Sequence, residues 1–139
     1  AIDCTGEALE AAVAARVDLI KPNEEEASHL VGFPVSDRPS AERAATLLIE
    51  RGVGSVLLSL GASGAIYRAA ESDAALYAPT PRAKVRSTVG AGDVLLATFL
   101  FTLTSGGTFA DALSSAVGWA AAKVEQPGTT MPTEPLRGA

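Results

Sequence analysis

The chain has 139 residues, of which 47% are hydrophobic, and a formal net charge of −5. This length suits one domain and the hydrophobic content suffices for a core, so we expect a folded chain rather than a disordered one. The negative charge argues against broad nucleic-acid binding, which needs a basic face. A small phosphate ligand remains compatible with it, because backbone N–H groups and one or two cations can hold phosphate locally.

Cys4 is the single cysteine and His29 the single histidine. They exclude an intramolecular disulfide and a Cys/His zinc site, and a reducing, cytoplasmic setting is expected. We expect Cys4 to be a small buried residue and His29 to lie at the surface. The longest apolar run follows Asp93 and is shorter than the about 20 residues that span a bilayer. No secretory signal is visible, so neither a membrane nor a nucleic acid is expected as a partner.

The first 60 residues are expected to form, in order, a helix over 6–17, a strand over 17–20, a helix over 24–32, a loop over 33–40, a helix over 41–52 and a strand over 55–60. Thr5 is suited to cap the first helix. Gly32 and Gly52 end the second and third. The last strand is apolar almost throughout, which is typical of a strand buried on both faces.

The rest of the chain is expected to form, in order, a turn over 61–64, a return strand over 65–69, a strand over 75–79, a basic loop to Arg86, a helix over 92–107 and a helix over 109–125. Thr108 and Asp111 form an N-terminal capping pattern for the last helix. Helices that alternate with short apolar strands predict an α/β fold, a three-layer α/β/α sandwich with a mostly parallel sheet. The piece from 61 to 80 is expected to be locally antiparallel.

The stretch STVGAGD, residues 87–93, places a glycine-rich turn before an apolar helix. Free N–H groups and the helix dipole make such a turn a ready anion site, and Gly90 and Gly92 let a ligand approach the main chain. Asp93 has two interpretations. It is either the N-cap of the helix, where Asp is favoured, or a general base beside the bound phosphoryl group. The pattern is not a Walker loop, which needs Gly-Lys-Ser/Thr.

The stretch KPNEEE begins with a lysine at the end of an apolar strand, where a charge is costly unless it faces a cleft. Asn23 and Glu26 are three residues apart at a helix start, so they suit a capping pair. The same spacing puts both side chains on one face, where they could hold Mg²⁺ through water. Both interpretations of this pair remain open.

The stretch SLGASGA contains Gly61 and Gly64, which suit either a plain hairpin turn or a ligand-binding turn. Like the two stretches above, it follows the C-terminal end of a predicted strand, where open α/β sheets bind ligands. Trp119 is expected in the core or in the wall of a cleft.

Together these motifs resemble the ribokinase/PfkB family of carbohydrate kinases. STVGAGDVLLATFL is similar to the second signature of the family, KPNEEE to its Asn-x-x-Glu motif and SLGASGA to its nucleotide-binding turn. DCTGEAL is similar to the Asp-x-Ser/Thr-Gly-Glu-Ala-Leu segment of the branch that acts on phosphosugars. The match runs over nearly the whole chain, in the order and spacing of the family.

The resemblance implies a ribokinase-like fold, ATP and Mg²⁺ as cofactors, and roles for individual residues. Asp93 would be the catalytic base, and Asn23 and Glu26 would organise Mg²⁺ and phosphate. The N–H groups implied to form the anion hole are those of Gly90, Ala91 and Gly92. The residues implied to contact the nucleotide are Lys21, Ser59, Gly61, Ala62, Ser63, Gly64, Ser87, Thr88, Val117 and Gly128.

The resemblance also bears on substrate and domain organisation. Lys21 and Ser59 resemble the members that phosphorylate hexose phosphates, which implies conversion of fructose 1-phosphate to fructose 1,6-bisphosphate. A kinase for fructose 6-phosphate or tagatose 6-phosphate, and a nucleotide- or sugar-phosphate-sensing module without turnover, are the alternatives. Family members are longer, so residues 1–139 are expected to be the C-terminal, nucleotide-binding and catalytic part. We expect its partners to be the sugar phosphate, ATP and the missing N-terminal half of the same protein, which carries the lid, and a homodimer is left open.

Overall fold

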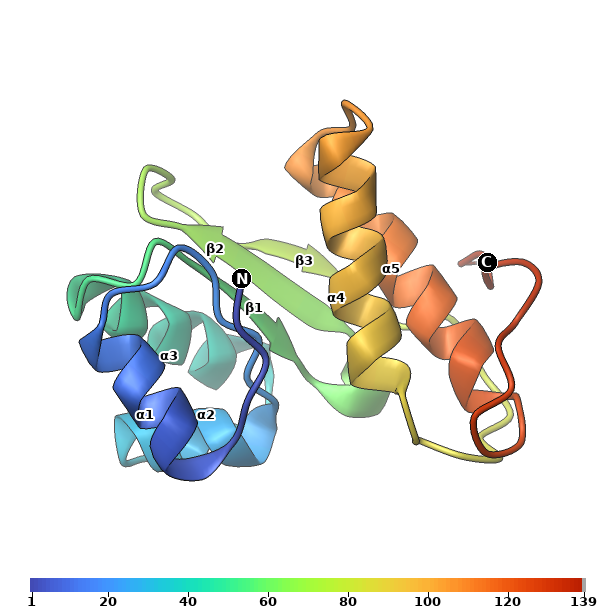
Figure 1. The fold of residues 1–139 in the computed structure, drawn as a ribbon, viewed down its shortest axis with the longest axis horizontal. Coiled ribbons are helices and arrows are strands. Elements are labelled where there is room, and N and C mark those ends of the chain that lie inside the picture. Colours follow the sequence, from blue (N-terminus) through green and yellow to red (C-terminus); the bar gives the residue numbers. More distant parts are fainter. Residues whose placement is uncertain (139) are drawn as a thin grey trace. The chain divides into compact units, whose positions relative to one another are not determined.

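The computed structural model describes residues 1–138, and the chain divides into two compact units that meet between Tyr77 and Ala78 (Figure 1). Each unit is built from the segments that the hydrophobic pattern favours. The first contains α1 (Gly6–Ala14), α2 (Glu24–Val31), α3 (Arg38–Glu50), β1 (Ser55–Ser59), the 3₁₀ turn η1 (Gly61–Ser63), β2 (Ala65–Ala69) and β3 (Leu76–Ala78), which ends at the boundary. The second contains α4 (Ala91–Thr104) and α5 (Phe109–Val124).

The sheet has the strand order β1-β2-β3, and β1 and β2 form an antiparallel hairpin closed by η1. Ser55 lies opposite Ala69, and Ser59 lies opposite Ala65. The first four residues of β1 are buried, because apolar residues lie on both of its faces. The buried strand and the antiparallel return strand expected from the sequence are both confirmed.

The expected mostly parallel, three-layer sheet is not what the described residues show. Parallel pairing is limited to single bridges, Ile2 with Ile20, Ile20 with Val56 and Asn23 with Ser59. The strand expected over 17–20 is therefore reduced to one bridging residue. Further along this segment, Pro22 has no N–H group and cannot donate to a ladder. Its carbonyl group still accepts a hydrogen bond from the N–H group of Ser59 at 3.1 Å.

Helix α3 packs on β1 and β2 through small side chains. Its buried residues are Ala41, Ala44, Ala45 and Leu48. The helix begins three residues before the expected start, because Asp37 and Ser40 form a capping box. Pro39 lies in the first turn, where its missing N–H group would have no helical partner anyway. The loop expected over 33–40 thus ends at Asp37.

The first unit also contains three single residues for which the sequence predicts a position or role. Thr5 is the N-cap of α1, as expected, but its side chain makes no capping hydrogen bond. His29 lies at the surface, as expected, where its Nε2 atom is 2.8 Å from a carboxylate oxygen of Glu10. Cys4 is half-buried against the core rather than fully buried.

In the second unit α4 and α5 lie side by side (Figure 1). Val94, Leu95 and Phe99 are the buried residues of α4. The side chain of Thr108 accepts a hydrogen bond from the N–H group of Asp111, and the Asp111 carboxylate accepts one from the N–H group of Thr108, so the expected cap is confirmed. None of the helices within residues 1–138 is long and apolar enough to cross a membrane.

The cap of α5 makes stability depend on pH. Its hydrogen bonds to Thr108 lower the pKa of Asp111 below the ordinary value of 3.8. A lowered pKa means that the stabilisation is present above 3.8 and is lost as pH falls through the folded-state value. In the full-length protein, Asp111→Asn should therefore lower the melting temperature at neutral pH, and the difference from wild type should shrink below pH 3.8. Asp73→Asn, in an exposed turn, is the control, and a pH-independent difference for Asp111→Asn would contradict the cap.

Candidate active site

The turn before α4 is held by a short series of hydrogen bonds. The N–H groups of Arg86 and Ser87 both donate to the carbonyl oxygen of Val124, at 2.7 and 3.1 Å. The N–H group of Ala91 donates to the carbonyl oxygen of Thr88 at 3.2 Å, which closes the turn. Gly90 is the N-cap residue and has φ +77°, a left-handed conformation that favours glycine.

The first N–H groups of α4 are only partly available to a ligand. Those of Gly90, Gly92 and Asp93 have no hydrogen-bond partner within the part of the chain that the structure describes. That of Ala91 is engaged within the turn, so it differs from the other two groups expected to form the anion hole. Gly92 lies inside the helix and, unlike Gly90, does not have a positive φ.

Asp93 is the third residue of α4, and its side chain is exposed. It does not cap the helix, because the N-cap is Gly90 and no side-chain capping bond is present. The first of its two interpretations is therefore wrong. An acidic group in the first turn still interacts favourably with the helix dipole. That interaction needs no ligand, so the base role depends on what surrounds the carboxylate.

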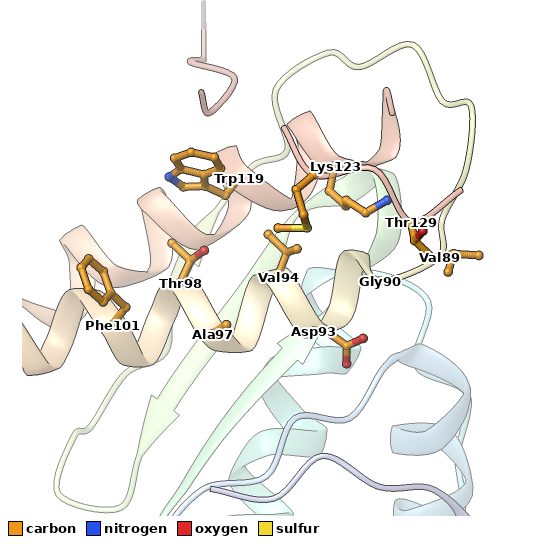
Figure 2. A pocket seen from close by; sticks show the side chains of 11 residues that line it. Val89, Gly90, Asp93, Val94, Ala97, Thr98, Phe101, Trp119, Lys123 and Thr129 are labelled. Carbon is orange, nitrogen blue, oxygen red and sulfur yellow. The ribbon is translucent and has the colours of Figure 1, made fainter. Parts of the chain in front are cut away.

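A cavity of about 670 Å³ lies along α4. Figure 2 shows side chains of α4 and α5 that line it, with Phe101 at one end and Val89 and Thr129 at the other. Trp119 forms part of the wall of this cavity, which is one of the two positions expected for it from the sequence. The lining residues are Val89, Gly90, Asp93, Val94, Ala97, Thr98, Phe101, Trp119, Lys123, Thr129 and Met131.

Lys123 is a charged member of this lining that sequence reasoning missed. It is 1% exposed, and its Nζ atom donates to the carbonyl oxygen of Gly128 at 2.7 Å. The signal in the sequence is a lysine within AAAKV, which reads as an ordinary cation at a helix end. Of the expected nucleotide contacts in this unit, Gly128 accepts this bond, whereas Val117 is buried in the core with 3% exposed.

In the first unit a bridge between Asn23 and Ser59 brings the KPNEEE and SLGASGA stretches together. Glu24 also lies close to the turn, since a Cβ atom added at Gly61 would be 3.7 Å from a Glu24 carboxylate oxygen. Ala62 and Ser63 are exposed and available to a ligand, whereas Gly64 is buried. The hydroxyl group of Tyr77 donates to the carbonyl oxygen of Ser63 at 2.6 Å, a support for the turn that sequence reasoning did not find.

Asn23 and Glu26 form the capping box that one of their interpretations predicts. Asn23 Oδ1 accepts from the N–H group of Glu26 at 2.8 Å, and Glu26 Oε2 accepts from the N–H group of Asn23 at 3.0 Å. The other carboxylate oxygen of Glu26 has no partner in residues 1–138. The described residues contain no group of three or more potential metal ligands. Mg²⁺ takes one or two carboxylates and keeps several waters, so an amide and a carboxylate fit its needs.

Lys21 is buried, and it pairs with Asp3, which offsets part of the cost of burying its charge. Its Nζ atom is 3.3 Å from Asp3 Oδ2, and the two side chains are 7% and 27% exposed. The register explains the pair, because the preceding residues, Ile20 and Ile2, form a parallel bridge. Asp3 begins the DCTGEAL stretch and is a second charged residue that sequence reasoning did not place in the site.

In this α/β protein a glycine turn opens a helix with free N–H groups and a carboxylate lies in the first turn of that helix, an arrangement that can hold an anion. The chain belongs to the family described as pfkB family carbohydrate kinase, whose model matches residues 2–136.

Similar proteins agree with this membership. The chain is 36% identical over 133 residues to a 1-phosphofructokinase of Rhodobacter capsulatus, covering 95% of this chain and 41% of the relative. It is 39% identical to a 1-phosphofructokinase of Haloferax volcanii, covering 95% and 42%. Among solved structures, phosphofructokinase-2 from Escherichia coli in complex with substrates and products has a TM-score of 0.83 at 30% identity, covering 94% and 42%. The chain therefore spans about two fifths of the length of these proteins.

The two glycines of the turn should respond differently to substitution by alanine. Gly90→Ala forces a side chain into the left-handed region and should lower the free energy of unfolding by about 1–2 kcal/mol. Gly92→Ala places alanine in a right-handed helical turn, where it is favoured over glycine by up to about 1 kcal/mol. Urea unfolding of both full-length variants measures the difference. Equal losses in the two variants would contradict the conformation described for the turn.

Proposed function

We propose that the chain is the nucleotide-binding and catalytic part of an ATP-dependent kinase that phosphorylates a hydroxyl group of a hexose phosphate. Fructose 1-phosphate is the substrate we favour, with fructose 1,6-bisphosphate as product. The support comes from the 1-phosphofructokinases among the relatives, which include two that cover almost the whole chain. Lys21 and Ser59 in the motifs of the phosphosugar branch agree with this choice.

One observation carries the proposal: an exposed Asp93 that does not cap its own helix and lies beside N–H groups without partners. A carboxylate that served only the fold would be expected to bond to the backbone, as Asp37 and Asp111 do at α3 and α5. Asp93 instead lines a cavity, and its carboxylate makes no capping hydrogen bond. A general base needs this freedom, because it has to reach the proton of a substrate hydroxyl.

In the proposed reaction Asp93 accepts the proton of the attacking hydroxyl group. The hydroxyl oxygen then bonds to the γ-phosphorus of ATP, the bond from that phosphorus to the bridging oxygen breaks, and ADP leaves with the bond's electron pair. The N–H groups of Gly90 and Gly92 donate to the phosphoryl oxygens as negative charge develops there. Because these donors are fixed by the turn before the substrate binds, they need no reorganisation during transfer.

Contacts with the nucleotide are proposed for each unit by itself. In the first, Lys21 offers its ammonium group to the phosphates and the turn from Ser59 to Gly64 contacts the nucleotide. In the second, Ser87, Thr88, Gly128 and the segment around Val117 would do so. Asn23 and Glu26 would hold Mg²⁺, directly or through water, and the metal supplies charge neutralisation for the phosphates when bound.

The substrate is tested by a coupled ADP-release assay on the full-length protein with fructose 1-phosphate, fructose 6-phosphate and tagatose 6-phosphate. We expect the highest kcat/KM with fructose 1-phosphate. Phosphorylation of fructose 6-phosphate is the main alternative, because the chain is 30% identical over 132 residues to the ATP-dependent 6-phosphofructokinase isozyme 2 of Escherichia coli. An absence of turnover with all three sugars would favour the sensing module instead.

The base role is tested by Asp93→Asn, which removes the proton acceptor and nearly preserves the shape. We expect kcat of the full-length enzyme to fall by about 10²-fold or more, the usual range for a general base. The melting temperature should change little, because Asp93 makes no capping bond that the variant could lose. ATP binding, measured by calorimetry, should also be nearly unchanged. A variant with almost full kcat would mean that Asp93 serves only the helix dipole.

The metal role is tested by Glu26→Gln. Glutamine can still accept the hydrogen bond from the N–H group of Asn23, so the capping box should survive with a small loss of stability. If Glu26 helps to hold Mg²⁺, loss of its negative charge should raise the Mg²⁺ concentration that gives the half-maximal rate. Glu25→Gln, on the neighbouring exposed residue, is the matched control. The same Mg²⁺ dependence in both variants would leave Glu26 as a capping residue only.

A further inference from the structure

Lys123 is a buried ammonium group without a counter-ion. It is 1% exposed, and no carboxylate of residues 1–138 lies within ion-pair distance of it. Its one hydrogen bond, to the carbonyl oxygen of Gly128, uses one of three donors. Lysine is almost never fully buried unless it is paired, because an uncompensated charge is costly in the interior. Because burial of this charge costs free energy that an apolar side chain would not, we look for a role of Lys123 beyond packing.

The position of Lys123 connects two loops of the second unit. Its ammonium group holds Gly128, in the loop that follows α5. Its side chain also passes Gly90, since a Cβ atom added there would be 3.5 Å from Lys123 Cε. Figure 2 shows the lysine lying along the cavity toward Thr129, near the loop at Val89. The stem of the lysine therefore lies between the loop after α5 and the turn that opens α4.

The two residues after Lys123 contact the same turn from the other direction. The carbonyl oxygen of Val124 accepts from Arg86 and Ser87, and a carboxylate oxygen of Glu125 accepts from the N–H group of Lys84 at 2.7 Å. Three consecutive residues at the end of α5 thus hold the loop that leads to α4 and the loop that follows α5. Among these three residues, Lys123 is the one that buries a charged group to make its contact.

Two simpler roles fit less well. A cation that only complements the dipole at the C-terminal end of a helix can do so from the surface, where it keeps its hydration and avoids the cost of burial. A partner for Asp93 would form an ion pair with it, and none is present between these two residues. In Figure 2 the Asp93 carboxylate does not point toward the Lys123 ammonium group.

We propose that Lys123 is a positioning residue for phosphoryl transfer. Its ammonium group fixes the Gly128 loop against the Gly90 turn, and through that turn it sets where the N–H groups of Gly90 and Gly92 point. Its positive charge, beside the turn that receives the phosphoryl group, also favours an anion there. The inference rests on the proposed kinase function, because the orientation of these donors matters only if a phosphoryl group binds to them.

The test uses Lys123→Met in the full-length protein, which keeps the aliphatic stem and removes the charge. Lys84→Met, at an exposed lysine in the loop that leads to α4, is the control. We expect kcat of Lys123→Met to fall by about 10–10²-fold, because displacement of catalytic donors by about 1 Å costs up to that much. KM for ATP should change much less, and the control should resemble wild type. Lys123→Arg, which keeps a charged donor, should recover most of the loss.

Chemical rescue separates lost positioning from general damage. Ammonium ions should partly restore kcat of Lys123→Met, because they can occupy the space of the missing group and donate to the Gly128 carbonyl. Tetramethylammonium ions at equal ionic strength have no N–H group and should not. A kcat that is unaffected by Lys123→Met, or rescue by both ions alike, would overturn the proposal.

A readout independent of activity separates this proposal from the proposed function. Amide hydrogen exchange of Arg86, Ser87 and Ala91, whose N–H groups are hydrogen-bonded in the turn, should be at least about tenfold faster in Lys123→Met, since a hydrogen bond to a charged group is worth that much or more. Exchange in α3 should be unchanged. If wild type turns over no sugar, faster exchange would retain the positioning role while the kinase assignment fails. Unchanged exchange would overturn the positioning role in either case. If Lys123→Met does not fold, Lys123→Gln, which also removes the charge, takes its place in the exchange measurement with the same expected result.

Discussion

The carbonyl oxygen of Val124, which accepts two successive N–H groups of the chain, is the constraint on which the candidate catalytic turn depends. These bonds fix Arg86 and Ser87 at the end of α5. Only a few residues then remain to reach the start of α4, and a left-handed Gly90 completes the reversal within that length. Because α4 starts immediately after the turn, its first N–H groups remain without helical partners. Their availability follows from how the turn is anchored and not from any residue that binds phosphate.

The sequence predicts the elements with strong local signals well. The caps at Asn23 and Thr108, the buried β1 and the hairpin to β2 all arise from patterns within a few residues, and all are confirmed. The start of α3 was placed too late because Pro39 suggested a loop, although proline is tolerated in the first turn of a helix. The mostly parallel sheet is not confirmed within the described residues, where parallel pairing is limited to single bridges, because pairing between distant segments depends on contacts that no local pattern reports.

The candidate site divides in the same way. Asp93, Gly90 and the Asn23–Glu26 pair lie in short motifs, so the sequence identifies them as candidates, and the structure supplies their conformation. Lys123 and Asp3 could not be found in this manner. Each has a role that depends on a partner far along the chain or on burial, as the pair of Asp3 with Lys21 illustrates. A charged residue on an apolar helix face is visible in the sequence, but its burial is not.

Each of the two units contains one buried lysine. The chain has a net charge of −5, yet two of its few lysines are buried, Lys21 in the KPNEEE stretch and Lys123 beside the Gly90 turn. Only one of them has a carboxylate partner. Asp3 offsets the cost of burying Lys21 before any ligand binds, whereas Lys123 has a neutral carbonyl group and would gain from an anion nearby. A chain that is acidic overall can therefore still attract phosphate, because its buried cations act at short range where water screens them least.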